Sequence, residues 1–286
     1  MTVVPSSVAV AIFAHQEERR IGACLASLPL NRPDTLFHVL VNGTTDATVA
    51  RARDAAGGRA NVIVHDIQAG GKSRTWNHMV HDLLTGREQA VIFMDGDAQI
   101  VAESVDALVA DLAAHPHANA ASGMPMNGRM AHTYRGTLHS EGGLFGDLYA
   151  LSGRFVADIR ARKLRLPDDL IGDDGLVASW AHTGLQRDIA WDLAGIVPCD
   201  DAGFLCEQVS LARPQTWRMH YKRLINYSVR FYQNRIVSDI MTREGPGGLP
   251  ARLATLYPEW LPRFHPRPGV TGWFDRKALK RMRDAV

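Results

Sequence analysis

The sequence predicts an α/β protein: a mixed, mostly parallel sheet with flanking helices, followed by a helical, basic C-terminal extension. Short apolar runs, typical of buried parallel strands, alternate with segments whose apolar residues recur at helical spacing, and this order is typical of βαβ units. Charge also divides the 286-residue chain. From Arg213 to the last residue there are 15 Lys and Arg against 5 Asp and Glu, which leaves 17 against 25 before it. We therefore predict one domain over residues 1–212 and an extension over residues 213–286 that packs on it.

The composition is that of an ordinary globular protein, with 46% apolar residues and a formal net charge of +2. No apolar run approaches the roughly 18 residues of a membrane span. Cys24, Cys199 and Cys206 have no Cys-x-x-Cys spacing and cannot all pair, which favours a reducing cytoplasm. We expect no nucleic-acid partner. The basic extension favours an anionic membrane face or an anionic substrate, with an ordinary solvated surface as the alternative.

The first βα unit begins with the apolar run 8–14, which predicts a fully buried strand. Ile21, Leu25 and Leu28 then recur at helical spacing. The loop between strand and helix is polar, and it lacks the Gly-x-Gly-x-x-Gly of dinucleotide-binding folds. This absence argues against an NAD-dependent enzyme.

Two further strands are predicted over residues 37–41 and 61–65. Asn42 directly follows the first, and its amide, which both donates and accepts, suits the edge of a nucleobase. A glycine-rich turn follows the second, with Lys72 and Arg74 at the start of a helix, where backbone N–H groups and the helix dipole can hold a phosphate. It is not a complete P-loop, because an aspartate occupies the position of that motif's first glycine. A solvated Lys72 is the alternative.

The fourth strand, residues 91–94, runs directly into Asp95-Gly96-Asp97, so a buried strand delivers two carboxylates to its tip. Strand tips of open α/β sheets are where ligands bind. Carboxylates this close repel one another unless a cation lies beside them, and a divalent ion that carries a diphosphate meets that need. The alternative is an Asp-Gly turn with solvated acids.

A second acidic centre is formed by Asp173 and Asp174. Both precede a helical pattern, so their carboxylates are predicted at a helix N-terminus. Helix capping is the alternative for Asp173. Asp168 and Asp169 form another acidic pair close by, and the sequence alone does not exclude them from the same role.

The remainder of the chain predicts one or two antiparallel strands from Ile189 on, with Ile196 and Val197 among them, and another over residues 209–212. A long helix is then predicted to begin at Thr216. Arg223 and Arg230 lie seven residues apart in that helix and therefore on one face, from which they can reach a diphosphate.

His220 in the same helix is a candidate third metal ligand, with a structural role as the alternative. The terminal helix, residues 275–283, carries Phe274, Ala278 and Met282 opposite its basic residues. This pattern suits a membrane surface or an ordinary docked helix.

Together these motifs resemble the family 2 glycosyltransferases of the GT-A fold. The resemblance covers residues 8–190 and rests on four motifs in order: a strand followed by Glu-Glu-Arg, then Val-Asn-Gly-Thr-Thr-Asp-Ala-Thr, Gly-Lys before a helix, and a strand that ends in Asp-Gly-Asp-Ala. In that family the first two loops hold the nucleoside, the Asp-x-Asp motif holds the ribose and the metal-bound diphosphate, and a later Asp is the base. The donor-binding positions implied for this chain are Ala14, His15, Glu17, Asn42, Thr44, Lys72, Asp95, Gly96, Asp97 and Arg223.

The resemblance further implies Asp174 as the catalytic base, with Asp173 in the Glu position beside it. It implies Asp97 and His220 as ligands of Mg²⁺ or Mn²⁺. One departure from the family is Asn42, because many members carry an acid at that position.

The activity implied is the inverting transfer of a sugar from a nucleotide diphosphate sugar to a hydroxyl acceptor. A UDP-sugar is favoured over a GDP-sugar, and the acceptor is a glycan, a glycolipid or a small hydroxylated molecule in cell-surface glycan or glycolipid synthesis. The donor half would span about residues 1–115 and the acceptor half 116–212, in the cytoplasm or in peripheral contact with the inner face of the membrane. Two alternatives stay open: a sugar nucleotidyltransferase, whose glycine-rich first loop is missing here, and a non-catalytic sugar-nucleotide-binding protein. The oligomeric state is open.

Overall fold

The computed structural model describes residues 7–207 and 214–286. Its sheet has the strand order β3-β2-β1-β4-β7-β6-β8-β5. Neighbouring strands are parallel from β3 to β4 and between β6 and β8, whereas β7 and β5 run in the opposite direction to their partners. The strands are β1 (Val8–Ala14), β2 (Thr35–Asn42), β3 (Val62–Ile67), β4 (Ala90–Asp95), β5 (Ala98–Ile100), β6 (Ala120–Pro125), β7 (Tyr149–Ser152) and β8 (Ile196–Cys206). The predicted mixed, mostly parallel sheet is confirmed.

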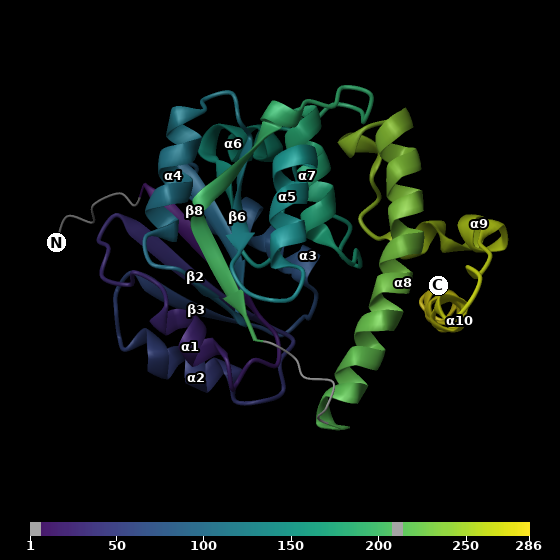
Figure 1. Ribbon diagram of the computed structural model, residues 1–286, viewed down its shortest axis with the longest axis horizontal. Coiled ribbons are helices and arrows are strands. Elements are labelled where there is room, and N and C mark those ends of the chain that lie inside the picture. The colour runs from purple at the N-terminus through teal and green to yellow at the C-terminus, as the bar shows by residue number, and fades with distance from the viewer. Residues whose placement is uncertain (1–6, 208–213) are drawn as a thin grey trace.

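Helices cover both faces of this sheet (Figure 1). One hydrophobic core lies between the sheet and α1, α2 and α4, and the other lies between the opposite face and α3, α6, α7, α8 and α10. The helices are α1 (Ile21–Ala26), α2 (Thr48–Ala56), α3 (Lys72–His78), α4 (Ser104–Ala114), α5 (Ala131–Glu141), α6 (Gly153–Ala161), α7 (Asp173–Thr183), α8 (Pro214–Arg243), α9 (Tyr257–Trp260) and α10 (Thr271–Arg283).

The four apolar runs that predicted strands are β1 to β4, and each ends close to the predicted residue. Two short strands, β5 and β7, were not predicted, because three or four residues give too little alternation to read. The strand predicted at Ile196 and Val197 is the start of β8. Residues 189–195 before it contain no strand and end in a short 3-10 helix, Leu193–Gly195. The strand predicted at 209–212 falls outside the described residues.

The C-terminal extension shares the core of the sheet domain. Tyr232 and Ile236 of α8 are fully buried, and Ala278 and Met282 of α10 are buried in the same cluster. Figure 1 shows α9 and α10 beside α8, on the side away from the sheet. Ala278 and Met282 on the apolar side of α10 therefore pack on protein, as the docked-helix alternative predicted. Contact of this helix with a membrane stays a prediction. Within the described residues, no helix is both long and apolar enough to cross a bilayer.

Two histidines lie side by side within the sheet, on β2 and β3. His38 is 3% exposed, and its Nδ1 lies 3.0 Å from Nε2 of His65. Burial, together with the proximity of His65, lowers the pKa of His38 to about 4. The folded protein thus keeps this ring neutral at pH values where an unfolded chain protonates it.

Because the pKa of His38 is lowered in the folded protein, we predict that acid destabilises the fold. Because the pKa of His38 is lower in the folded state than in the unfolded state, its contribution to stability is complete above about pH 6.5 and is lost as the pH falls toward 4. We expect the free energy of unfolding to fall by up to about 3 kcal/mol from this residue over that range. Urea unfolding at pH 7 and pH 5 measures the effect. His38→Leu should flatten the pH dependence, whereas His132→Leu at an exposed position should retain it.

Candidate functional site

A pocket of about 700 Å³ opens where the carboxyl ends of β1, β2 and β4 meet. Its walls come from segments that are far apart in the sequence: the loops after these strands, residues 168–173 before and at the start of α7, and two residues from the C-terminal extension. Of the residues that the sequence singled out, those that line the pocket are Ala14, His15, Glu17, Asn42, Lys72, Arg74, Asp95, Asp97, Asp168, Asp169 and Asp173. Thr44, Gly96, Asp174, His220 and Arg223 are not among its lining residues.

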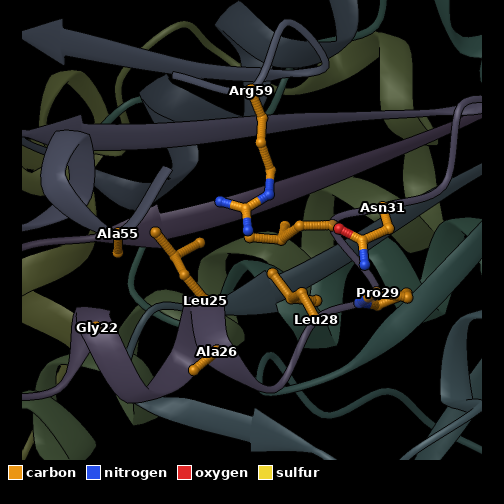
Figure 2. A pocket seen from close by; sticks show the side chains of 9 residues that line it. Gly22, Leu25, Ala26, Leu28, Pro29, Asn31, Ala55 and Arg59 are labelled. Carbon is orange, nitrogen blue, oxygen red and sulfur yellow. The ribbon is translucent and has the colours of Figure 1, made fainter. Parts of the chain in front are cut away.

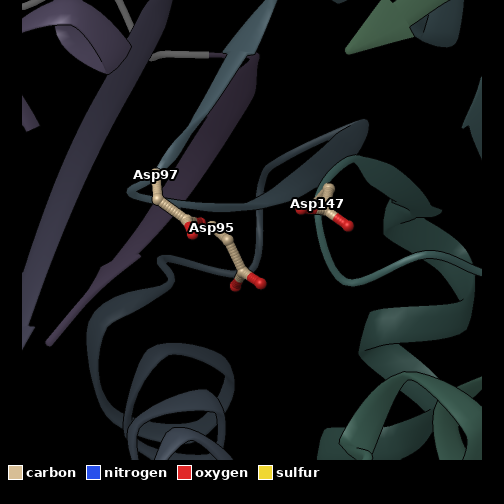
Figure 3. A group of neighbouring side chains, drawn as sticks. All are labelled: Asp95, Asp97 and Asp147. Atoms are coloured by element: carbon tan, nitrogen blue, oxygen red, sulfur yellow. The ribbon is translucent and has the colours of Figure 1, made fainter. Parts of the chain in front are cut away.

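Three carboxylates gather at one side of this pocket. Asp95 ends β4 and Asp97 follows it, while Asp147 arrives from the tight turn between Phe145 and Leu148 (Figure 3). One oxygen of each carboxylate lies within 4.8 Å of the others, so the three can share a single cation. Hard oxygen ligands of this kind suit Mg²⁺ or Mn²⁺.

Asp147 was missed by the sequence analysis. Its only local signal is a Gly-Asp pair inside the glycine-rich stretch 141–153, and such a pair is also ordinary loop sequence. Tertiary structure supplies the rest, because β7 pairs with β4 and thereby brings the turn before β7 to the tip of β4.

Basic side chains already neutralise this acidic group. The ammonium of Lys72 lies 2.5 Å from Asp95 and 3.9 Å from Asp173, and Arg20 contacts Asp97 at 3.1 Å. Burial alone would lower the pKa of Lys72, but the carboxylates of Asp173 and Asp95 hold it well above its ordinary value. Burial raises the pKa of Asp95, and the nearby Asp147 carboxylate adds to that effect while Lys72 opposes it. Ion pairs with Lys72 and Arg20 thus hold these carboxylates close together.

Glycines allow this close approach at two points. A Cβ on Gly96 would lie 2.9 Å from Cβ of Ala14 and 3.0 Å from the carbonyl oxygen of Phe13, so the tips of β4 and β1 can touch only with glycine there. A Cβ on Gly146 would lie 2.6 Å from Nζ of Lys72. Gly96 therefore shapes the site through its missing side chain.

The loops after β1 and β2 are tied together by side chains. Asn42 donates to the carbonyl of Ala14 at 3.2 Å and accepts from the backbone N–H of Gly71 at 3.1 Å. Nδ1 of His15 lies 2.8 Å from the carbonyl oxygen of Asn42. The Asn42 amide is thus used mainly to hold the loops, which leaves one amide proton for a ligand.

Thr44 and Glu17 belong to the same network. Thr44 accepts from the backbone N–H of Gln16 at 3.1 Å, and the backbone N–H of Glu17 donates to Thr48 at 2.7 Å. Asp46 accepts from the backbone N–H of Thr48 at 3.0 Å, which forms an Asx turn directly before α2, whose N-cap position is Ala47. Burial, with the nearby Asp97 carboxylate, raises the pKa of Glu17 to about 7.

The second acidic centre lies at the first turn of α7, where Asp173 and Asp174 were predicted. Asp173 is 5% exposed, and burial raises its pKa, helped by Asp174 and opposed by Lys72. Asp174 forms an ion pair at 3.1 Å with Arg230 of α8. The long helix of the C-terminal extension therefore holds this carboxylate in place.

The neighbouring acids have other partners. Both oxygens of Asp169 accept backbone N–H groups, from Leu253 at 2.7 Å and from Ala254 at 2.9 Å. Asp168 pairs with Arg74 at 3.2 Å. These contacts anchor the C-terminal extension and α3. They give Asp168 and Asp169 structural partners that the sequence did not reveal, and so distinguish this pair from Asp173 and Asp174.

Gly172 provides a direct test of the link between α7 and α8. It has φ of +92°, and a Cβ there would lie 2.3 Å from Nε of Arg230. We expect Gly172→Ala to lower the free energy of unfolding by about 1–3 kcal/mol, because strain and a clash with a paired guanidinium add together.

The matched control is Gly184, which ends α7 with φ of +57° and would place a Cβ in open space, with no neighbouring atom within 4 Å. Gly184→Ala carries the backbone strain without the clash, so its cost should be about 1 kcal/mol. Thermal unfolding of both variants measures the difference. Equal losses in the free energy of unfolding would show that the Arg230 side chain can move away from the added Cβ at no cost.

Two predicted residues of α8 lie outside the carboxylate group. Among the described residues, the group that can share a cation consists of Asp95, Asp97 and Asp147, without His220. Nε2 of His220 is buried with no hydrogen-bond partner in the described part of the chain, and Arg223 is exposed. Their proposed roles in binding stay predictions. The extension instead contributes Asn226 and Arg281 to the pocket wall, and neither was predicted.

A separate pocket of about 500 Å³ lies between α1 and α2 (Figure 2). Its walls are largely apolar, with Leu25 and Leu28 prominent, and no carboxylate is found among the described residues that line it. The guanidinium of Arg59 at its edge donates to the carbonyl of Ala56 at 2.9 Å. The described lining of this second pocket therefore lacks the carboxylates that line the pocket at the strand tips.

Comparisons with known proteins agree with this architecture. A family model described as Glycosyl transferase family 2 matches residues 9–192. No curated protein matches the chain. A mannosyltransferase from Pyrobaculum calidifontis, in complex with GDP-Man and Mn²⁺, is similar with a TM-score of 0.63 and 17% identity over 99% of this chain and 75% of that chain. A glucosyl-3-phosphoglycerate synthase from Mycobacterium tuberculosis, in complex with Mn²⁺, UDP-glucose and phosphoglyceric acid, is similar with a TM-score of 0.52 and 19% identity over 78% of this chain and 79% of that chain.

Proposed function

Because the chain belongs to glycosyl transferase family 2, we propose that it is a metal-dependent, inverting enzyme that moves a sugar from a nucleotide diphosphate sugar to a hydroxyl acceptor. The observation that carries the proposal is that two acidic centres lie side by side. The group of Asp95, Asp97 and Asp147 suits a divalent cation. Asp173 and Asp174 form the second centre at the start of α7, where Asp173 lies 3.9 Å from the Lys72 ammonium that also contacts Asp95. Donor activation and acceptor deprotonation need two such separate centres.

The first centre would hold the donor diphosphate. Asp97 is the principal ligand of Mg²⁺ or Mn²⁺ in this proposal, with Asp95 and Asp147 beside it. A divalent ion bound there neutralises the negative charge that develops on the departing nucleoside diphosphate. Lys72 adds a fixed positive charge at the same place, because its ammonium lies against Asp95 and the glycine turn that contains Gly146. Two solved structures of similar fold hold Mn²⁺ together with a nucleotide sugar, which supports this assignment.

The second centre would act on the acceptor. Asp174 is the proposed base, which takes the proton of the attacking hydroxyl, and Asp173 is its neighbour. The ion pair with Arg230 holds the Asp174 carboxylate in a fixed orientation. In-line attack on the side of the sugar opposite the leaving group gives the inverted product.

For the donor we favour a UDP-sugar, with a GDP-sugar as the rival. The loops that carry Ala14, His15, Glu17, Asn42 and Thr44 would surround the nucleoside. A glycan, a glycolipid or a small hydroxylated molecule is the acceptor class. The three cysteines are free thiols in the structure, which is in keeping with a cytoplasmic protein.

A donor-hydrolysis assay tests the proposal. UDP- and GDP-sugars are incubated with the protein in the presence of Mg²⁺ or Mn²⁺ and then with EDTA. We expect release of nucleoside diphosphate that EDTA abolishes. Release of pyrophosphate from a nucleoside triphosphate and a sugar phosphate would favour a nucleotidyltransferase instead, and tight donor binding without turnover would favour a binding protein.

A further inference from the structure

The C-terminal extension contributes Asn226 and Arg281 to the pocket wall, and the two helices that carry them are rich in basic residues. Residues 214–238 hold five Lys and Arg and no Asp or Glu: Arg218, Lys222, Arg223, Arg230 and Arg235. Helix α10 adds five more: Arg276, Lys277, Lys280, Arg281 and Arg283. Its single acid, Asp275, is fully buried and pairs with Arg267 at 2.7 Å. Arg281 therefore faces the same pocket as the acidic residues at the strand tips.

Within that pocket, Arg281 differs from the other cations. Lys72 lies against Asp95 at 2.5 Å and Arg74 pairs with Asp168 at 3.2 Å, so the protein itself neutralises both. Arg281 lines the pocket as well, but it has no carboxylate within 4.0 Å among the residues that the structure describes. Its Nη1 donates to Oδ1 of Asn226 at 2.7 Å.

The hydrogen-bond partner of the Arg281 guanidinium is a neutral amide. Asn226 orients Arg281 through a neutral acceptor, so the positive charge remains available to a ligand. A planar guanidinium with its remaining N–H donors matches the oxygens of a phosphate group, which it can bind through two parallel hydrogen bonds. The carboxylates of Asp95 and Asp97 repel an anion that is not bound to a metal, so a phosphate group would bind at Arg281 rather than beside them.

We propose that Arg281, positioned by Asn226, binds a phosphate group of the second substrate, so that the acceptor is a hydroxyl compound that bears a phosphate. This inference rests on the proposed function, in which the donor diphosphate lies at the strand tips. The surplus of positive charge on α8 and α10 favours a doubly charged phosphate ester over a carboxylate. The phosphate belongs to a soluble ester or to a lipid headgroup, which share this chemistry.

The experiment titrates inorganic phosphate into the protein saturated with Mg²⁺ and UDP or GDP, followed by calorimetry. The nucleotide occupies the donor region, so any remaining phosphate site is separate from it. We expect wild type to bind phosphate and Arg281→Gln to bind it at least about tenfold more weakly, which is the effect of losing one charge-assisted hydrogen bond. Lys280→Gln is the matched control, because Lys280 is exposed on the same helix and does not line the pocket.

The possible outcomes distinguish failure of the proposed phosphate site from failure of the proposed function. Equal phosphate affinity in wild type and Arg281→Gln, or no phosphate binding at all, overturns the inference. Displacement of phosphate by the nucleotide also overturns it, because the site would then serve the donor. If the nucleotide itself fails to bind, the proposed function fails, and the same two variants still test the phosphate site in the free protein.

A second arm identifies the source of the phosphate. Glycerol 3-phosphate represents a soluble ester, and vesicles of phosphatidylcholine with phosphatidic acid represent a lipid headgroup. Arg281-dependent binding to either one supports the inference and names the source. Binding to both that persists in Arg281→Gln contradicts it.

Discussion

Replacing Asp97 by Asn is expected to lower kcat/KM for sugar transfer by about 10²–10³-fold, because the change removes one of the three carboxylates proposed to hold the divalent cation. The same change should leave the fold intact. Asp97 lies among other acids, and its loss relieves repulsion with Asp95 and Glu17 while Arg20 keeps its contact with Glu17 at 2.5 Å. Activity and stability should therefore move independently. Steady-state kinetics and thermal unfolding of the same preparation measure both.

The control for this change is Asp200→Asn. Asp200 is an exposed acid that pairs with His139 at 3.1 Å on the surface, so its loss should leave kcat/KM within a factor of about two. If Asp97→Asn kept wild-type activity at saturating Mn²⁺, the carboxylate would not be the principal ligand.

Replacing Asp174 by Asn should lower kcat by about 10²–10⁴-fold, since an amide cannot accept the acceptor hydroxyl's proton. Affinity for the nucleoside diphosphate should stay unchanged, because Asp174 is not part of the carboxylate group that suits the metal. Calorimetric titration with UDP or GDP and single-turnover kinetics separate binding from chemistry.

Asp168→Asn is the comparison for that variant. Asp168 lines the pocket and pairs with Arg74, yet it has no place in the proposed chemistry, so kcat should fall less than tenfold. Full turnover by Asp174→Asn with intact donor binding would reject Asp174 as the base. A larger loss in Asp168→Asn than in Asp174→Asn would move the base to the other acidic pair.

Much of the donor side of the site was predictable, because its geometry follows from local patterns. A fully apolar run such as 91–94 can only be a buried strand or helix, and the acids that follow it directly must then lie at its end. The parallel order of β1, β2 and β4 brings their tips to one edge. The sequence therefore predicted that Asp95, Asp97 and Lys72 lie at this edge, as they do in the structure, and their role in donor binding stays a prediction.

The rest depended on contacts between distant segments, which leave little local trace. Asp147 joins the group only because β7 pairs with β4, and Arg230 reaches Asp174 only because α8 packs beside α7. The apolar side of α10 illustrates the same limit. The helical spacing of Ala278 and Met282 is the same whether the helix contacts a bilayer or another helix. Only the fold shows that these two residues are buried in protein.

Anomalous diffraction from crystals grown with Mn²⁺ and UDP or GDP tests the central claim most directly. The account predicts a manganese peak within bonding distance of an Asp97 carboxylate oxygen and of the nucleotide diphosphate. A nucleotide bound with no manganese at Asp97, or with the metal held by other residues alone, would contradict it.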